Sequence, residues 1–323
     1  MRYKQKMLQA LADSRNTLEG QLPWLAAWDL YFGRGLFQEA LLLKRLWCQS
    51  HVAELDELAP ELSQLQALCW LGDYGRVEAL ISAASPSGNL KKLLPYLQQN
   101  IAVLQGDSTA ESFAGRNRFA SLVAGKQILL EGPGAFSEQG MPYQYDLRVA
   151  FNWLGDGDAP DIAYYSKENF THNQDLIEAL LAACRLKFAV VNGFNPAKLA
   201  SPVAADVADR VLAPSPFLLG FHAPLLGVPR CLYDMISAGA SGVYVSGADF
   251  YTRFPYHNDR YATRLTEIEQ FLYSWAAHDL SFNYSLVQRL MKSGAVTGDA
   301  CFTGALETDV ESYFHKLYER LPK

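Results

Sequence analysis

From about residue 110 onward, the chain alternates between short β-rich runs and amphipathic helical stretches. The β-rich runs are KQILLEGPG, APDIAYYS, KFAVVNGF and GVYVSGADF, and each leads into Gly, Ser or Asn. Between them lie helical patterns such as NQDLIEALLAACRL and RCLYDMISAG. Strands and helices that alternate at this spacing predict a parallel sheet with helices on both faces. Ligands of such sheets bind beyond the carboxyl ends of the strands, so the strand-terminal residues are the first candidates for a site.

The first 108 residues have a different pattern, made almost entirely of helix signals. LPWLAAWDLYFGRGLFQEALLLKRLWCQ and LSQLQALCWLGDYGRVEALISAA both carry apolar residues at helical spacing. GRGLFQEA, from Gly33, aligns with GDYGRVEA, from Gly72, and the second segment is similar to the turn of a tetratricopeptide-type repeat. This predicts antiparallel helix pairs. Two interpretations stay open: a helical cap on the rest of the chain, or a docking surface for a protein partner or a second copy.

We therefore predict two domains. Residues 1–110 are expected to form an all-α helical-repeat domain that is tetratricopeptide-like, and residues 111–323 an α/β domain. The second domain is expected to be Rossmann-like, with a mostly parallel sheet. The polar segment GDSTAESFAGRNRFASLVAG, which contains Gly and Ser, places the boundary near residue 110.

Composition and charge narrow the class of protein. Half of the residues are hydrophobic and 19% are charged, which is typical of a globular chain. The net charge of −6 and the lack of a Lys/Arg cluster argue against nucleic-acid binding. The first 20 residues do not read as a signal peptide, and no run approaches the ~18 apolar residues of a membrane span. We expect a cytoplasmic protein whose five scattered cysteines are reduced, with only peripheral membrane contact open to it.

Three strand ends carry small or polar residues. Gly132, Pro133 and Gly134 follow the run ILLE, and glycines there allow the backbone to approach a ligand closely. This turn lacks the GxGxxG pattern and the Lys and Ser/Thr of a P-loop, so an ordinary dinucleotide or ATP site is not supported. Asn152 and Ser166 end the next two runs. Each has two interpretations, namely contact with a ribose or base edge, or capping of the following element.

The run VYVSGADFY brings Asp249 and Tyr251 to another strand end, with Tyr256 shortly after. A phenol donates a hydrogen bond to a phosphate oxygen without bringing a full charge. Two tyrosines at a strand end therefore predict stabilisation of a nucleotide leaving group, whereas the alternative is that Tyr251 is a core aromatic under a loop.

His278 lies next to Asp279, just before an amphipathic helix expected at Tyr284 to Lys292. Because histidine titrates near neutrality, His278 is a candidate general base, and the alternative is a helix cap. The chain has no HExxH or GxSxG motif, and Asp156-Gly157-Asp158 reads as a solvated turn. We therefore predict neither a metal site nor Ser-based hydrolysis.

The order of these motifs along the chain resembles that of one family. The order is a strand followed by Gly-Pro, a strand followed by Asn, the segment Ser-Gly-x-Asp-Phe-Tyr, and a late His before a helix. It is the family of small bacterial sialyltransferases that modify lipooligosaccharide, with related proteins of flagellin glycosylation and an archaeal-type pterin pyrophosphokinase group. The resemblance covers roughly residues 125–292. Its most specific parts are VYVSGADFY and AHDLSFNYSLVQRL. It implies transfer of a sugar from CMP-sialic acid to a glycan with inversion, and without a metal or cofactor.

The resemblance also implies roles for individual residues. Gly132 and Pro133 match the nucleotide-binding turn, and Asn152 matches an Asn that contacts the donor. Tyr251 and Tyr256 match a tyrosine pair on the departing phosphate. His278 matches the base that takes the proton of the acceptor hydroxyl, and we expect Asp279 to hold its tautomer.

The chain departs from the family at three places. The Asn-Gly-Pro-Ser turn is Glu131-Gly132-Pro133-Gly134 here, and the second strand-end Asn is Ser166. The Thr-Ser-Gly that contacts the sialate carboxylate corresponds to Leu225-Leu226-Gly227. Arg230 or Arg253 is expected to pair with a sugar carboxylate instead.

The function expected from the sequence is thus an inverting, metal-independent glycosyltransferase of polysaccharide biosynthesis that uses a CMP-activated acidic sugar. Sialic acid, Kdo and other nonulosonic acids are all open as the sugar. Two alternatives are a nucleotide-dependent, pyrophosphokinase-like enzyme and a non-catalytic binding or assembly protein on the same fold. A lipid-linked acceptor would bring the protein to the inner face of the cell membrane.

Overall fold

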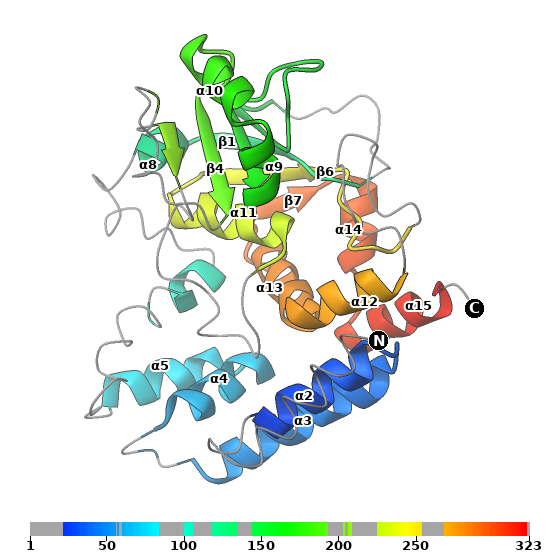
Figure 1. Cartoon of the computed structure of the whole chain (residues 1–323). Coiled ribbons are helices and arrows are strands. Elements are labelled where there is room, and N and C mark those ends of the chain that lie inside the picture. The colour runs from blue at the N-terminus through cyan, green and yellow to red at the C-terminus, as the bar shows by residue number, and fades with distance from the viewer. Residues whose placement is uncertain are drawn as a thin grey trace.

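A parallel β-sheet forms the centre of the second half of the chain (Figure 1). The computed structural model describes residues 22–55, 57, 60–83, 98, 100–105, 118–134, 144–192, 203, 206–208, 225–253 and 268–321. Within these residues the sheet has seven strands in the order β5-β4-β3-β2-β1-β6-β7, and each neighbouring pair is parallel. The strands are β1 (Gln127–Glu131), β2 (Leu147–Phe151), β3 (Ile162–Ser166), β4 (Phe188–Asn192), β5 (Val207–Ala208), β6 (Gly242–Ser246) and β7 (Val296–Gly298).

Helices precede the sheet and connect its strands. Those before β1 are α2 (Leu22–Phe32), α3 (Phe37–Ala53), α4 (Leu62–Leu71), α5 (Tyr74–Ala83) and α8 (Arg118–Val123). Those after it are α9 (Lys167–His172), α10 (Gln174–Ala182), α11 (Gly227–Ser237), α12 (Ile268–Ala277), α13 (Leu280–Lys292), α14 (Ala300–Leu306) and α15 (Val310–Glu319). The predicted α/β class is confirmed, and so are the four β-rich runs at β1, β3, β4 and β6. Helix α13 begins earlier than predicted, at Leu280.

The two faces of the sheet are covered by different helices. Along β3, Ile162 and Tyr164 belong to the larger core with α11 and α13, whereas Ala163 and Tyr165 pack with α9 and α10. This alternation follows from the two-residue period of a strand, which points successive side chains to opposite faces. Both faces are therefore buried, as expected for a parallel sheet.

The strand order reverses between β1 and β6. From β1 the chain builds outward through β2, β3, β4 and β5, and then returns to the other side of β1 to add β6 and β7. The connections that leave β1 and β6 run in opposite directions, so a crevice is expected at their carboxyl ends. The Gly-Pro-Gly turn at 132–134 and the SGADFY segment at 246–251 both lie at this point.

The N-terminal helices share their core with the C-terminal ones. Phe32 of α2 meets Phe314 of α15 edge-on at 5.4 Å between ring centroids, and Phe37 of α3 lies 6.4 Å from Trp275 of α12. The indole of Trp28 donates a hydrogen bond to the carbonyl of Ala276 at 3.4 Å. In Figure 1, α2 and α3 lie beside α12 and α15. The expected division at residue 110 stays a prediction.

Two helix pairs, α2 with α3 and α4 with α5, occupy the segment in which repeats are expected. Their turns are built differently. In the first turn Gly35 has the positive φ, 73°, whereas in the second it is Gly72, with φ 82°. Gly33, which aligns with Gly72 in sequence, has no such conformation. The helix pairs support the predicted secondary structure, but the aligned glycines do not occupy equivalent positions.

Two further findings concern helices and cysteines. Among the described residues, no helix has the length and apolar character needed to cross a membrane. All five cysteines are free thiols, and Cys48, Cys69 and Cys231 are buried, whereas Cys184 is exposed.

A fully buried ion pair joins helix α3 to the start of α13. The ammonium of Lys44 donates to Asp279 Oδ2 at 2.5 Å and to Ser281 Oγ at 2.9 Å, and both charged side chains are 0% exposed. The ammonium also lies 5.1 Å from the ring centroid of Trp28 and 5.0 Å from that of Trp70. Burial alone would raise the pKa of Asp279, but the Lys44 charge and hydrogen bonds hold it below its usual value.

We expect Lys44→Met to lower the free energy of unfolding by about 3–5 kcal/mol, because it leaves the Asp279 carboxylate buried without its cation. Chemical denaturation measures this change. Lys44→Met/Asp279→Asn should recover part of the loss, since the uncompensated charge is gone. The control is Arg45→Met on the same helix. Arg45 pairs with Glu311 at the surface, where an ion pair contributes at most about 1 kcal/mol. A Lys44→Met variant no less stable than Arg45→Met would contradict this account.

Candidate active site

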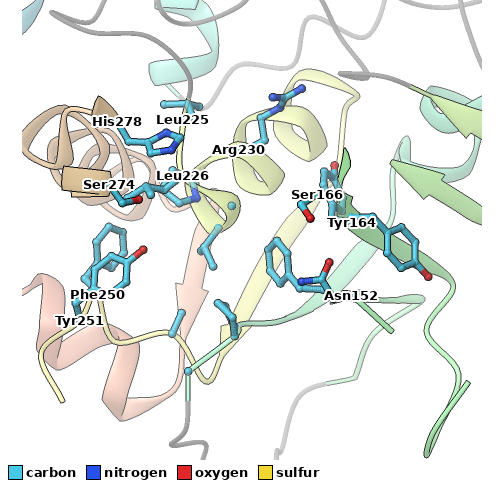
Figure 2. Close-up of a pocket in the computed structure, with 18 of the residues that line it drawn as sticks. Asn152, Tyr164, Ser166, Leu225, Leu226, Arg230, Phe250, Tyr251, Ser274 and His278 are labelled. Carbon is cyan, nitrogen blue, oxygen red and sulfur yellow. The ribbon is translucent and has the colours of Figure 1, made fainter. Parts of the chain in front are cut away.

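A cavity of about 270 Å³ opens at the reversal of strand order. It is enclosed by residues that end strands β2 and β3, by the turns after β1 and β6, by the first turn of α11, and by the end of α12. Figure 2 shows its arrangement: His278, Ser274 and Tyr251 lie on one side, and Asn152 and Ser166 lie on the other. The cavity therefore occupies the position that the topology predicts for a ligand.

The structure brings together most of the residues singled out from the sequence. Nine of them line this one cavity: Pro133, Gly134, Asn152, Ser166, Gly227, Arg230, Asp249, Tyr251 and His278. They come from six separate segments, so their convergence is a consequence of the fold and not of sequence proximity. Three other predicted site residues are not among those that line the cavity. Tyr256 lies outside the described residues, Gly132 lines a neighbouring hollow, and Asp279 is buried in the interior.

The glycines of the turn after β1 allow this turn to pack closely against the backbone that follows β6. A Cβ on Gly132 or on Gly134 would lie 2.5 Å from the carbonyl oxygen of Gly247. The two backbones are also hydrogen-bonded, because Gly132 N donates to Ser246 O at 2.6 Å and Gly134 N to Gly247 O at 2.8 Å. The close approach expected between this turn and a ligand is thus observed between the turn and its neighbour in the sheet.

Asn152 is the most unusual polar group of the cavity. It is 9% exposed, and its Oδ1 is buried with no hydrogen-bond partner among the residues that the structure describes. Its backbone is left-handed, with φ 50°, and is held by a 2.9 Å hydrogen bond from its N–H to Tyr164 O. Buried acceptors are normally satisfied, and non-Gly residues with positive φ concentrate at functional sites. The amide oxygen is therefore available to accept from an N–H or O–H of a ligand.

The other polar strand end, Ser166, has a structural partner. Its Oγ accepts from the N–H of Asn169 at 3.1 Å and caps helix α9. This is the capping role that the sequence left open. Ser166 also lines the cavity, so contact with a ligand stays open for it beside the capping role.

The first turn of α11 gives the cavity a positive electrostatic character. Leu226 is the N-cap residue and makes no side-chain hydrogen bond to the helix. The N–H groups at a helix N-terminus carry a partial positive charge that favours anions. Gly227 fits closely there, since a Cβ would lie 3.1 Å from the ring of Phe151.

Arg230 adds a full positive charge one turn further along α11. Its side chain is 12% exposed, and its Nε donates to Asp234 Oδ2 at 3.3 Å. The hydroxyl of Tyr164 donates to the same oxygen at 3.2 Å. Asp234 therefore orients both side chains on the cavity wall. The position of Arg230 is consistent with the expected contact to a carboxylate.

Asp249 is a buried carboxyl group in the wall of the cavity. Burial raises its pKa to about 6, and the hydrogen bond from the N–H of Tyr251 and the charge of Arg253 lower it only in part. That N–H lies 3.1 Å from Asp249 Oδ1, and the Thr252 hydroxyl donates to the Asp249 carbonyl at 2.7 Å. A carboxyl group that titrates near neutrality inside a cavity is typical of functional sites.

Tyr251 combines a core contact with an exposed polar end. Its ring packs against Trp275 at 5.1 Å and against Phe271 at 6.4 Å between centroids. Its hydroxyl points toward the cavity in Figure 2. Both Phe250 and Tyr251 have positive φ, 49° and 62°. The ring of Tyr251 is thus a core aromatic, one of the two interpretations from the sequence, and the ligand contact stays a prediction.

His278 lies in the short turn between α12 and α13, on the same side of the cavity as Ser274 and Tyr251 (Figure 2). The backbone N–H of His278 donates to the backbone carbonyl of Ser274 at 3.1 Å. The buried amide of Asn283 donates to the His278 carbonyl at 2.5 Å and accepts from the N–H of Leu226 at 2.9 Å. Asn283 thereby fixes the distance between His278 and the start of α11.

Asp279 was expected to contact the imidazole of His278, but its carboxylate lies in the interior beside Lys44. Besides the ion pair with Lys44, its Oδ1 accepts from Ser281 Oγ at 2.7 Å and from the N–H of Phe282 at 3.1 Å. The carboxylate therefore caps α13 and neutralises Lys44, and it is not part of the cavity wall. These contacts correct the expectation that Asp279 serves the imidazole directly. Asp279 instead anchors the turn that carries His278.

Sequence reasoning missed several residues that build this site. Asp299 is buried, and its Oδ2 accepts from Gly247 N at 2.8 Å and from Ser246 Oγ at 3.2 Å, which fixes the turn after β6. Its position just before helix α14 is a cap signal, but nothing local indicates its distant partners. Asn283, Lys44 and Ser274 gave no signal at all, because their roles depend on contacts across the fold.

Within the described residues, no group of three His, Cys, Asp or Glu side chains could hold a metal ion. What the cavity offers chemically is hydrogen bonding, a positive helix terminus, an arginine, a buried carboxyl group and an imidazole.

We expect Asp249→Asn to change how stability depends on pH. Because the folded-state pKa of about 6 lies above the usual 3.8, the stabilisation is fully present below pH 3.8 and is lost as the pH rises through 6. The unfolding free energy of the wild type should therefore fall by about 1 kcal/mol more than that of the variant between pH 5 and pH 7. Denaturant titrations of both proteins at the two pH values measure the difference. Equal falls in both proteins would contradict the buried state of this carboxyl group.

Comparison with protein-family models, with curated protein sequences and with solved structures finds no match to this chain. What the cavity binds therefore has to be inferred from its own residues and their geometry.

Proposed function

We propose that the cavity binds a CMP-activated acidic sugar and that the protein is an inverting, metal-independent glycosyltransferase with His278 as general base. One observation carries the proposal: an imidazole and an anion-favouring helix terminus line the same cavity at the reversal of strand order. Glycosyl transfer from a nucleotide donor needs both, because a proton leaves the acceptor while negative charge develops on the leaving phosphate.

The two sides of the cavity suit the two ends of the reaction. On one side, Asn152 Oδ1, which has no hydrogen-bond partner among the described residues, can accept from an amino or hydroxyl group of the nucleotide. Between the sides, the N-terminus of α11 favours the leaving phosphate, and we assign Arg230 to the carboxylate of the sugar. On the other side, we assign the Tyr251 hydroxyl as a donor to the phosphate.

Transfer of the sugar then proceeds by a single displacement at the anomeric carbon. Neutral His278 accepts the proton of an acceptor hydroxyl while that oxygen forms a bond to the anomeric carbon. The bond from this carbon to the phosphate oxygen breaks, and the electron pair leaves with CMP. A hydrogen bond from Tyr251 to the phosphate strengthens as its charge grows, so it stabilises the transition state more than the ground state.

The N-terminal helices give the proposal a second part. We propose that residues 1–110 form a helical, tetratricopeptide-like domain that docks a protein partner. Leu42 and Leu46 lie one turn apart on α3 and are 54% and 47% exposed, which leaves an apolar strip for a partner. We place the reaction in the cytoplasm, at the inner face of the membrane when the acceptor is lipid-linked.

We expect His278→Ala to lower turnover by about 10²- to 10⁴-fold, because general-base catalysis contributes that much. The assay is release of CMP from CMP-sialic acid and from CMP-Kdo in the presence of a set of glycan acceptors. Stabilisation of the folded protein by CMP, measured as the shift in Tm, should be the same in the variant and in the wild type. His315→Ala, which removes an exposed histidine on α15, is the matched control and should be fully active.

Three results would contradict the proposal. A His278→Ala variant that transfers sugar at the wild-type rate would exclude His278 as the base. A wild type that releases no CMP from either donor would exclude the donor class. Stabilisation by ATP and not by CMP would favour a pyrophosphokinase-like enzyme on this fold.

A further inference from the structure

A second hollow, of about 210 Å³, lies behind the turn that follows β6. Thr252 and Arg253 of that turn form one wall, and helices α14 and α15 form the others, with Cys301, Lys316 and Arg320 among the lining residues. Its lining shares no residue with the large cavity. It belongs to a separate site, although Thr252 directly follows Tyr251 of the cavity wall.

The lining of this hollow is strongly basic. Arg253, Lys316 and Arg320 all contribute to it, and none of the described lining residues is acidic. This stands out in a chain whose net charge is −6. Three positive charges around one concave space favour a compact anion with more than one negative charge.

The two cations on the C-terminal side of the hollow lie close together at one helix end. Lys316 and Arg320 are four residues apart at the end of α15, where like charges repel each other across one helical turn. In the part of the chain that the structure describes, neither forms an ion pair. The nearby Glu319 pairs with His315 at 3.3 Å instead. An anion between Lys316 and Arg320 would relieve this repulsion.

The turn that carries Arg253 is fixed in place. The Thr252 hydroxyl donates to the Asp249 carbonyl at 2.7 Å, and the Tyr313 hydroxyl of α15 donates to the Phe250 carbonyl at 2.7 Å. The Tyr313 bond ties the turn to α15, so the backbone that carries Arg253 and the helix end that carries Lys316 and Arg320 are held beside the same hollow. The fold thus sets the backbone positions of the three cations around the hollow.

We propose that this second hollow binds a phosphate-type anion, either free or carried on a larger molecule. The guanidinium forks of Arg253 and Arg320 match the geometry of phosphate oxygens, and the Lys316 ammonium adds a third contact. A nucleic acid is not favoured, because the basic surface is confined to one small hollow. The inference goes beyond the proposed function and does not depend on it.

The test is calorimetric titration of the whole protein with inorganic pyrophosphate and with glucose 1-phosphate at low ionic strength. Lys316→Gln/Arg320→Gln should weaken binding by about tenfold or more, since each removed cation takes a charge-assisted hydrogen bond with it. The matched control, Lys126→Gln/Lys167→Gln, removes the same charge from exposed positions elsewhere and should bind as the wild type does. Arg230→Gln should also leave this binding unchanged.

The outcomes distinguish a free anion from a phosphate carried on a sugar. They also distinguish the second hollow from the large cavity. Tighter binding of pyrophosphate indicates a free anion, and tighter binding of glucose 1-phosphate indicates a phosphate carried on a sugar; both support the hollow if Lys316→Gln/Arg320→Gln loses the binding. Three results would overturn it: no binding by the wild type, equal binding by Lys316→Gln/Arg320→Gln, or loss of binding only in Arg230→Gln, which would move the anion to the large cavity.

Discussion

A lysine ammonium that is fully shielded from water needs an anion beside it. In this protein the anion is Asp279, the residue that follows the candidate base His278. Lys44 lies on α3 in the N-terminal half, whereas its partner Asp279 is the N-cap residue of α13. Burial lowers the pKa of Lys44, and the carboxylate opposes that shift. The turn that carries His278 is therefore stabilised by a helix from the other end of the chain. Correct folding of the N-terminal helices becomes a condition for a correctly formed site.

The cavity wall is assembled by a few buried polar residues that each connect two segments. Asn283 joins His278 to Leu226 and so ties α12 to the start of α11. Asp299 holds the turn after β6, and Asp234 holds Arg230. Each of these side chains is satisfied within the protein. The Asn152 oxygen differs from them because it has no partner in the described part of the chain, and this contrast indicates which polar group of the wall can serve a ligand.

The sequence was sufficient to predict the α/β class and the β-rich runs at β1, β3, β4 and β6, because strands of a parallel sheet are buried on both faces and are short, apolar and bounded by turn residues. It also identified most of the cavity wall, since strand ends of a parallel sheet meet on one edge. It could not assign Asp279, because the choice between serving an imidazole and neutralising a lysine depends on Lys44, 235 residues away. Likewise, whether Gly132 faces a ligand or a neighbouring backbone is decided by Gly247, which only the fold brings near.

The most direct measurement of the central claim is a crystal structure of the protein soaked with CMP. The account predicts the nucleotide in the large cavity, with an amino or hydroxyl group donating to Asn152 Oδ1 and the phosphate between Tyr251 and the N-terminus of α11. A cavity that stays empty at saturating CMP, or CMP bound elsewhere on the protein, would contradict it.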